Sequence, residues 1–222
     1  MKEPVKSRRP YRSPVREERA LANRAAILEA ARARFLADGY PRTSIAAIAT
    51  DAGVSEDLVY LLFRTKRHLL VEVLNFSATG KLDSPKVLDQ QGPQAVRAEK
   101  DQRQQIAMFA ADIARRTAAT RPIDDVMRSA ALVDDTIATK RERLHRTRLE
   151  NLHQFVGWVA TNGPLRAGLT VDTAAATVWA LTGADMHRML VDDLGWSQDQ
   201  FASWIHLTLE ATLLPPIGEP RR

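Results

Sequence analysis

Helical spacing of apolar residues is the feature that most restricts what this chain can fold into. Shorter runs of this spacing lie between residues 18 and 74. Longer helices are expected over 95–119, 123–135, 137–161, 171–191 and 198–214. Glycine or proline interrupts the pattern, at Arg121-Pro122, Gly163-Pro164, Gly168 and Gly195. No segment shows the alternation that is typical of a β-strand. We therefore predict an all-α protein.

The chain contains no cysteine, so disulfide bonds and thiolate metal sites are excluded and stability must come from packing. An apolar content of 45% is sufficient for a buried core in 222 residues. No apolar run approaches the roughly 20 residues that cross a bilayer, and the start of the chain is basic rather than apolar. We expect a protein without membrane spans that stays in the cytoplasm.

Positive charge is concentrated in the first third of the chain. Residues 1–70 contain 14 Lys and Arg against 8 Asp and Glu, whereas residues 71–222 contain 18 against 19. A basic module attached to a near-neutral body is typical of proteins that bind a polyanion such as nucleic acid. A solvated basic tail explains the same numbers, so charge alone does not decide between the two.

Two short helices with a tight turn between them are predicted within residues 43–63. Thr43 or Ser44 is a suitable N-cap for the first helix, and Ser55 for the second. Ala52-Gly53 separates the two, because glycine allows a sharp reversal of the backbone. A longer helix precedes the pair and another begins near Lys66. This order is typical of a helix-turn-helix unit.

The segment from about residue 20 to residue 70 resembles the DNA-binding domain of the TetR family of transcriptional regulators. The residues that carry the resemblance are Ile27-Leu28, Ala30-Ala31, Phe35, Gly39-Tyr40, Thr43-Ser44-Ile45, Ile48-Ala49, Ala52-Gly53-Val54-Ser55, Tyr60, Phe63, Lys66 and Leu69-Leu70. An unrelated three-helix bundle would share the apolar spacing but not this turn with Tyr, Phe and Lys at these offsets. The rest of the chain matches only in the number and length of its helices.

The resemblance implies a non-enzymatic regulator without a cofactor. Its fold would be an N-terminal three-helix helix-turn-helix domain followed by a C-terminal helical bundle for dimerisation and ligand binding. We expect a disordered basic arm over 1–17, the DNA-binding domain over 18–66, the effector-binding and dimerisation domain over 67–214, and a disordered tail over 215–222. The resemblance alone implies repression, relieved when a small apolar or amphipathic molecule binds.

The candidate DNA contacts lie around the two short helices and are Arg42, Thr43, Ser44, Ser55, Glu56, Tyr60 and Lys66. Thr43 and Ser44 offer hydroxyls and free amides at a helix N-terminus, which suits a phosphate oxygen, although ordinary capping explains both. The resemblance assigns Tyr60 and Lys66 to the DNA backbone. Burial of Tyr60 and simple solvation of Lys66 are the alternatives. Arg64 and Arg67 are further phosphate candidates.

Two features modify the expected affinity for DNA. Glu56-Asp57 replace a commoner Lys-Gly-type pair, which weakens attraction to phosphate. Glu56 either interacts with the helix dipole or accepts a hydrogen bond from cytosine N4. The basic arm offers Arg8, Arg9 and Arg12, whose spacing suits entry into the adjacent minor groove. A passive tail is the alternative for the arm.

The body is expected to form a homodimer through helices 171–191 and 198–214, because both are apolar on more than one side. A two-fold axis then predicts a palindromic operator. Large apolar residues that suit an effector pocket are Met108, Phe109, Met127, Phe155, Trp158 and Trp179. Packing in the protein core is the alternative explanation, both for the apolar faces of the two helices and for these six residues.

A second function class is an oxidase with a di-metal centre inside a helical bundle. It is suggested by two Glu-x-x-His pairs of the type that binds di-iron centres, Glu142 with His145 and Glu150 with His153. Both pairs lie on one helix about 80° apart, and no facing helix supplies bridging carboxylates. Solvated pairs and no metal site are therefore expected. No other catalytic motif is present. A DNA-binding architectural protein without a ligand is the third class.

Overall fold

The computed structural model describes residues 14–82 and 86–216, and within these ranges every regular element is helical. The helices of the first part are α1 (Pro14–Arg42), α2 (Ile45–Ala52), α3 (Glu56–Phe63) and α4 (Lys66–Thr79). The body contains the short η1 (Val87–Asp89), α5 (Gln91–Ala98), α6 (Gln102–Ala131), α7 (Asp135–Asn162), α8 (Val171–Leu181), α9 (Ala184–His187), the π-helical η2 (Arg188–Asp193) and α10 (Gln198–Leu213). The all-α prediction is confirmed.

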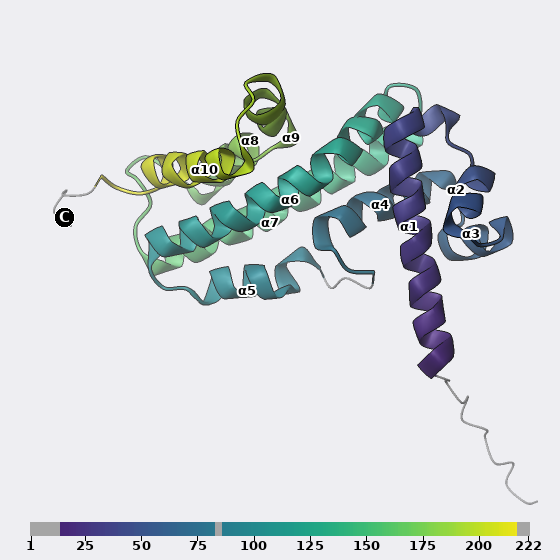
Figure 1. Cartoon of the computed structure of the whole chain (residues 1–222). Coiled ribbons are helices and arrows are strands. Elements are labelled where there is room, and N and C mark those ends of the chain that lie inside the picture. Colours follow the sequence, from purple (N-terminus) through teal and green to yellow (C-terminus); the bar gives the residue numbers. More distant parts are fainter. Residues whose placement is uncertain (1–13, 83–85, 217–222) are drawn as a thin grey trace, which may run out of the picture.

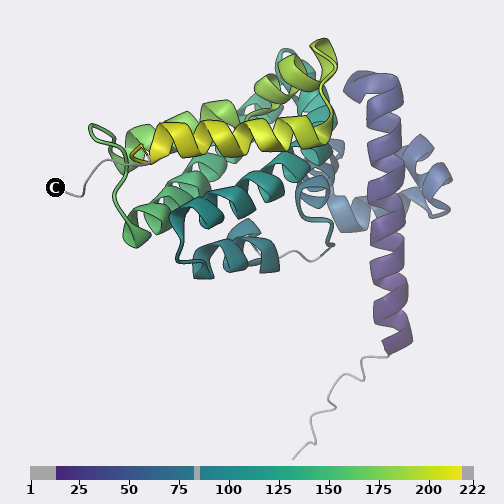
Figure 2. The same ribbon diagram turned by 60° about the vertical axis from the view of Figure 1, so that its left-hand side comes forward.

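The long helices α6 and α7 run side by side along the body (Figure 1). Helices α8 and α10 cover one face of this pair, and α5 lies on the opposite side (Figure 1). At one end of the body α1 stands across the direction of α6, with α2 and α3 beside it, as the turned view in Figure 2 also shows. None of the described helices is long and apolar enough to cross a membrane.

Two hydrophobic cores hold these parts together. The first joins α1 to α4 through Ile27, Phe35, Ile48, Val59, Phe63 and Leu70, and it includes Ile123 and Met127 of α6. The second lies in the body, among residues such as Ile106, Phe155, Val178 and Phe201. The expected boundary between residues 66 and 67 coincides with the start of α4, but α4 packs against both α1 and α6. We call the unit formed by α1 to α4 the reading domain. Its core therefore includes the C-terminal part of α6.

Helix starts follow the capping residues in the sequence. Ser44, Ser55 and Thr65 each accept a hydrogen bond from a backbone amide of the first turn that follows. Ser197 and Gln200 form the capping box that their spacing predicts at the start of α10. Side-chain chemistry near helix ends is local, which is why these boundaries can be predicted from the sequence.

Helix α1 begins at Pro14, three residues before the expected end of the basic arm at residue 17. Proline is tolerated in a first helical turn because its missing N–H would have no partner there, and Glu17 in the same turn favours the helix dipole. Arg8, Arg9 and Arg12 lie outside the described residues, as does most of the predicted tail 215–222.

Three expected boundaries in the body are wrong. The helix expected over 95–119 is interrupted at Glu99, and α6 starts after the Asp101 N-cap and continues through Pro122. Burial of Ile106, Phe109, Ile123 and Met127 on both sides of Pro122 outweighs the lost hydrogen bond. The helix expected over 171–191 is broken after Thr182, where side chains replace backbone donors: the Thr117 hydroxyl donates to the Thr182 carbonyl.

Replacement of Pro122 by alanine is expected to stabilise the protein. Alanine restores the amide donor inside α6, and we expect Pro122→Ala to raise the free energy of unfolding by about 2 kcal/mol. Urea unfolding followed by circular dichroism measures the change. Pro93→Ala is the matched control, because Pro93 lies in the first turn of α5, where proline costs little. A loss of stability in Pro122→Ala would contradict this account of the helix.

Candidate nucleic-acid interface and ligand pocket

Helices α2 and α3 form the predicted helix-turn-helix unit. Gly53 adopts a left-handed conformation with φ of 66°, and its amide donates to the Thr50 carbonyl at 3.2 Å. This geometry favours glycine and lets the chain reverse within one residue. Ile48, Val59 and Phe63 are buried under the unit and fix the position of α3 against α1 and α4. The remaining face of α3 points to solvent.

The exposed face holds most of the residues predicted to contact DNA. Tyr60 is 49% exposed, which excludes its burial in the domain core, and the neighbouring Leu61 is 77% exposed. Arg42, Ser44, Ser55, Glu56 and Arg64 are exposed as well. Ser44 and Ser55 also cap their helices, with Oγ to amide distances of 3.1 and 3.3 Å. The two short helices therefore present a mostly polar surface that also includes the aromatic Tyr60 and the apolar Leu61.

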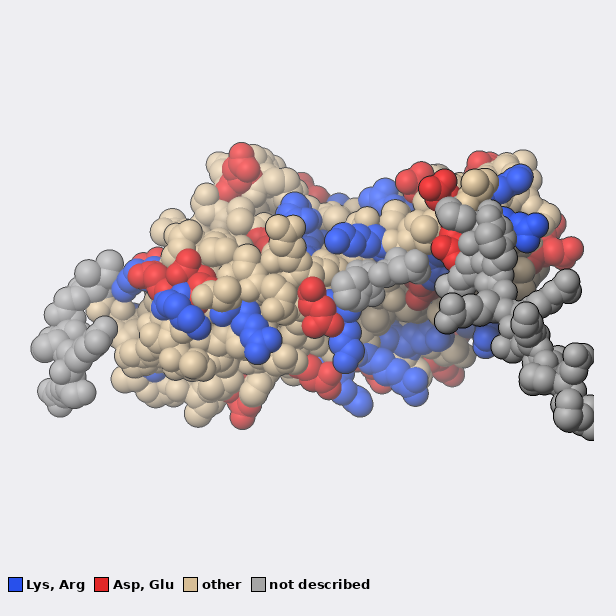
Figure 3. All heavy atoms as spheres, turned by 90° about the horizontal axis from the view of Figure 1, so that it is seen from below, with Lys and Arg blue, Asp and Glu red and all other residues tan. Residues whose placement is uncertain are grey.

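Charge on this end of the molecule is mixed. Figure 3 shows basic and acidic side chains alternating over the end that holds α1 and α3. Glu56 and Asp57 lie in the first turn of α3, where the helix dipole favours them. Arg16 and Arg19 of α1 line a hollow of about 210 Å³ together with Leu58 and Leu62 of α3. These two arginines bring positive charge beside α3, and their place next to α3 depends on how α1 packs, which the sequence does not show.

Thr43 does not occupy the expected exposed position. Its side chain is 2% exposed, and its hydroxyl donates to the Gly39 carbonyl at 2.8 Å and the Arg34 carbonyl at 3.2 Å. The kink at Gly39, where φ is 74°, frees these carbonyls from helical bonding at the end of α1. The Thr43 hydroxyl therefore closes the end of α1, and we withdraw it as a phosphate contact.

Lys66 differs from its expected role in a similar way. Its ammonium donates to the carbonyls of Tyr40 at 2.9 Å and Thr43 at 2.8 Å, and it lies 4.4 Å from the centre of the Tyr40 ring. Burial lowers the pKa of Lys66. An ammonium with two short hydrogen bonds to carbonyls and one aromatic contact is already bound inside the domain, so it is not free to bind a phosphate. Lys66 thus fastens α4 to the segment between α1 and α2.

Arg67 connects the reading domain to the body. Its Nε atom lies 2.7 Å from the carboxylate of Asp134, which also caps α7 by accepting from the amides of Thr136 and Ile137. The hydrogen bond and charge of Arg67 lower the pKa of Asp134. The ion pair is exposed on the arginine side, so its contribution to stability is small. Its position at the contact between α4 and α7 makes Arg67 a connecting residue rather than a free phosphate contact.

The body encloses an apolar pocket of about 280 Å³ between α4, α5, α6, α7 and the break after α8. Phe109, Phe155 and Trp158 line it, in agreement with the sequence prediction. Met127 does not, because it is completely buried in the core of the reading domain. Met108 and Trp179 pack against the body core outside the lining. The sequence did not indicate the lining residues Leu74 and Leu88, nor the polar group of Asp112, Arg116, Thr117, His145, Arg148 and Asn151.

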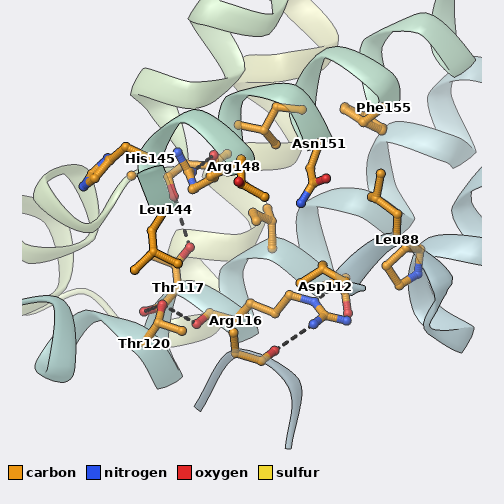
Figure 4. Close-up of a pocket in the computed structure, with 18 of the residues that line it drawn as sticks. Leu88, Asp112, Arg116, Thr117, Thr120, Leu144, His145, Arg148, Asn151 and Phe155 are labelled. Carbon is orange, nitrogen blue, oxygen red and sulfur yellow. Dashed lines mark hydrogen bonds and ion pairs between the residues drawn. The ribbon is translucent and has the colours of Figure 1, made fainter. Parts of the chain in front are cut away.

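One wall of this pocket is a single face of α7. Leu144, Arg148, Asn151 and Phe155 recur three or four residues apart, with His145 next to Leu144, and the close-up in Figure 4 shows these side chains around the pocket. Burial lowers the pKa of His145, so the imidazole is neutral at neutral pH. The pocket therefore combines apolar walls with a few fixed polar groups, as ligand sites do.

The two Glu-x-x-His pairs are not brought together with further candidate ligands in the part of the chain that the structure describes. His153 lies 2.9 Å from the exposed carboxylate of Asp172, and His145 faces the pocket. Among the described residues there is no group of three His, Cys, Asp or Glu side chains that is placed to hold a metal ion. The spacing of these pairs reflects the periodicity of α7 alone.

Known proteins resemble this chain in its N-terminal sequence and in its fold. Residues 27–73 match the model of the family described as bacterial regulatory proteins, tetR family. NalD from Pseudomonas aeruginosa, the secondary repressor of the MexAB-OprM multidrug efflux pump, is similar in fold, with a TM-score of 0.62, 20% identity, and coverage of 89% of this chain and 98% of NalD. A search of curated proteins found no match.

Two further structures of the same fold contain ligands. The SmeT–triclosan complex has a TM-score of 0.66 and 18% identity, with 90% of this chain and 99% of SmeT covered. The regulator FadR from Bacillus subtilis in complex with stearoyl-CoA has a TM-score of 0.62 and 15% identity, with 83% and 96% covered. At these identities the likeness establishes the fold.

Substitution of Lys66 separates a structural role from a phosphate contact. We expect Lys66→Met to lower the free energy of unfolding by about 2 kcal/mol, because carbonyls of Tyr40 and Thr43 lose a charged donor. The slope of log binding constant against log salt should remain unchanged for DNA, whereas loss of a phosphate contact would reduce it by about 0.9. Lys100→Met, at an exposed position before α6, is the control. A reduced slope with unchanged stability would contradict the assignment.

Proposed function

We propose that this chain, whose N-terminal domain belongs to the tetR family of bacterial regulatory proteins, is a repressor released from its operator by a small apolar or amphipathic molecule. The observation that carries the proposal is one continuous helix. Helix α4 begins at Lys66 beneath the DNA-reading unit and ends with Leu74, Asn75 and Ala78 in the wall of the pocket. A DNA-binding regulator of this kind acts in the cytoplasm, where its operator lies.

DNA binding is assigned to the exposed face of α2 and α3. Helix α3 enters the major groove, where Tyr60 and Ser55 contact the DNA. Arg42 and Ser44, which lie just before α2, bind phosphates of the DNA backbone. Arg64, at the end of α3, adds charge. Glu56 belongs to the same surface and lies near the bases. Its negative charge repels the phosphates. Arg8, Arg9 and Arg12 of the basic arm, which lie outside the described residues, add further positive charge.

Ligand response follows from the shared position of α4. A molecule in the pocket contacts the C-terminal half of α4, and the N-terminal half is fastened to the reading domain by Lys66 and to α7 by Arg67. A ligand that binds better to one position of α4 raises the population of dimers with that position, and thereby changes the distance between their two reading domains. Arrangements whose spacing does not match successive major grooves release the operator.

The effector class is supported by the pocket walls and by relatives. Most of the surface exposed inside the pocket is apolar, with side chains such as Phe109, Phe155, Trp158 and Leu88, although several polar and charged residues also line it. SmeT was solved with triclosan and FadR with stearoyl-CoA, both of which have large apolar parts. A volume of about 280 Å³ is near the lower end of the ~300–1,000 Å³ typical of small-molecule sites, so a small ligand fits best.

A homodimer through the 171–191 and 198–214 segments, now α8 to η2 and α10, is the proposed assembly. Leu207 of α10 is 65% exposed, and Met189 and Leu194, at and just after η2, are similarly exposed. Apolar side chains on neighbouring elements suit burial against a second copy. A ligand-independent architectural DNA binder is the alternative, and it is distinguished by the failure of every small molecule to release the operator.

Selection of bound sequences from random duplex DNA tests the DNA-binding function. We expect a palindrome whose half-sites are about one helical turn apart, because two copies of α3 related by a two-fold axis occupy successive major grooves. The same selection with Glu56→Gln should return the same sequence with higher affinity for all duplexes, since a repelled carboxylate is removed. A relaxed preference at one C·G pair would instead assign base reading to Glu56. No enriched sequence at low salt would overturn the proposed function.

A further inference from the structure

The charges that line the pocket do not cancel. Asp112 is paired with Arg116 at 2.6 Å, and Asp124 is paired with Arg141 at 3.2 Å. Arg116 also donates to the Ala78 carbonyl at 2.7 Å, so it is held at the wall next to α4 (Figure 4). These two pairs leave Arg148 as the remaining cation of the lining, since burial keeps His145 neutral.

Arg148 is held in place without a direct ion pair. Its two terminal nitrogens donate to the Trp179 carbonyl at 3.2 Å and to the Thr182 hydroxyl at 2.7 Å, both neutral groups. Among the described residues no carboxylate lies within ion-pair distance of its guanidinium, and Asp124, which attracts it from farther away, is paired with Arg141. Burial lowers the pKa of Arg148 to about 10, so the group is still charged at neutral pH. A buried cation without a partner costs stability, and an anionic ligand would relieve that cost.

Neutral hydrogen-bond donors lie on both sides of this cation. His145 and Asn151 are three residues before and after Arg148 on α7, and all three line the pocket. Figure 4 shows Asn151 and Arg148 on the same wall, above Thr117 and Arg116. One charged and two neutral donors along one helix face resemble a site for an anionic head group. The aromatic residues Phe109, Phe155 and Trp158 form the apolar remainder.

We propose that the effector of this pocket is an amphipathic carboxylate, with its carboxylate on Arg148 between His145 and Asn151 and its apolar body against Phe109, Phe155 and Trp158. This assignment rests on the proposed function of the pocket as the sensor site. It adds the charge of the ligand, which the apolar walls alone do not specify. A neutral or cationic molecule of the same shape would leave the Arg148 charge uncompensated.

Three probes with the same ten-carbon chain test the assignment: decanoate, 1-decanol and decyltrimethylammonium, each below its micelle concentration. Calorimetric titration into the full-length protein should give about ten-fold or more tighter binding for decanoate than for either other probe. Arg148→Met should remove this preference by weakening decanoate alone. Arg148→Lys should keep part of it, and Arg146→Met, an exposed arginine on the same helix, should leave it unchanged.

The outcomes separate this proposal from the general sensor function. If Arg148 only supports the chain break after α8, Arg148→Met will weaken all probes equally, and the carboxylate assignment is overturned. Decanoate that fails to bind, or binds no better than decanol, also overturns it. Release of operator DNA by decanol or the cationic probe in those cases would leave the sensor function standing. Thermal melting of each variant verifies that it is folded.

Discussion

The bonds from the Lys66 ammonium to the carbonyls of Tyr40 and Thr43 are the contacts on which the reading domain depends. They occur where α1 ends in a kink at Gly39, so several carbonyls there lack helical donors. The Thr43 hydroxyl satisfies another of them. One ammonium and one hydroxyl thereby fix the directions of α1, α2 and α4 together. The exposed face of α3 gains its position from this arrangement, because α3 is connected at both ends to these helices.

A second set of side-chain bonds replaces backbone bonds at the far wall of the pocket. After α8 the helix is interrupted, and the carbonyls of Trp179 and Thr182 accept from Arg148 of α7 and Thr117 of α6. The pocket is therefore bounded by α4 at one side and by a chain break at the other. The boundary after α8 is held by side-chain bonds, whereas α4 is a continuous helix that Lys66 and Arg67 attach to its neighbours.

Local signals made the reading domain predictable from the sequence. Ser44, Gly53 and Ser55 determine helix ends through bonds within a few residues, so their roles follow from spacing alone. The roles of Thr43 and Lys66 depend on the kink at Gly39, which sequence spacing does not reveal. In the body, Pro122 lies inside a helix because packing on both sides outweighs propensity. The polar lining of the pocket was missed for a related reason: Arg148 looks like one more solvated charge until α6 and α8 are placed beside it.

The threading of α6 through both cores affects how the chain can be divided. Ile123 and Met127, near the C-terminal end of α6, are completely buried among residues of α1 to α4. A fragment cut after α4 would expose the apolar surface that these side chains cover. The reading domain is thus not an autonomous module, despite its separate appearance in Figure 1. Cooperative unfolding of both parts in a single transition is the thermodynamic counterpart of this shared helix.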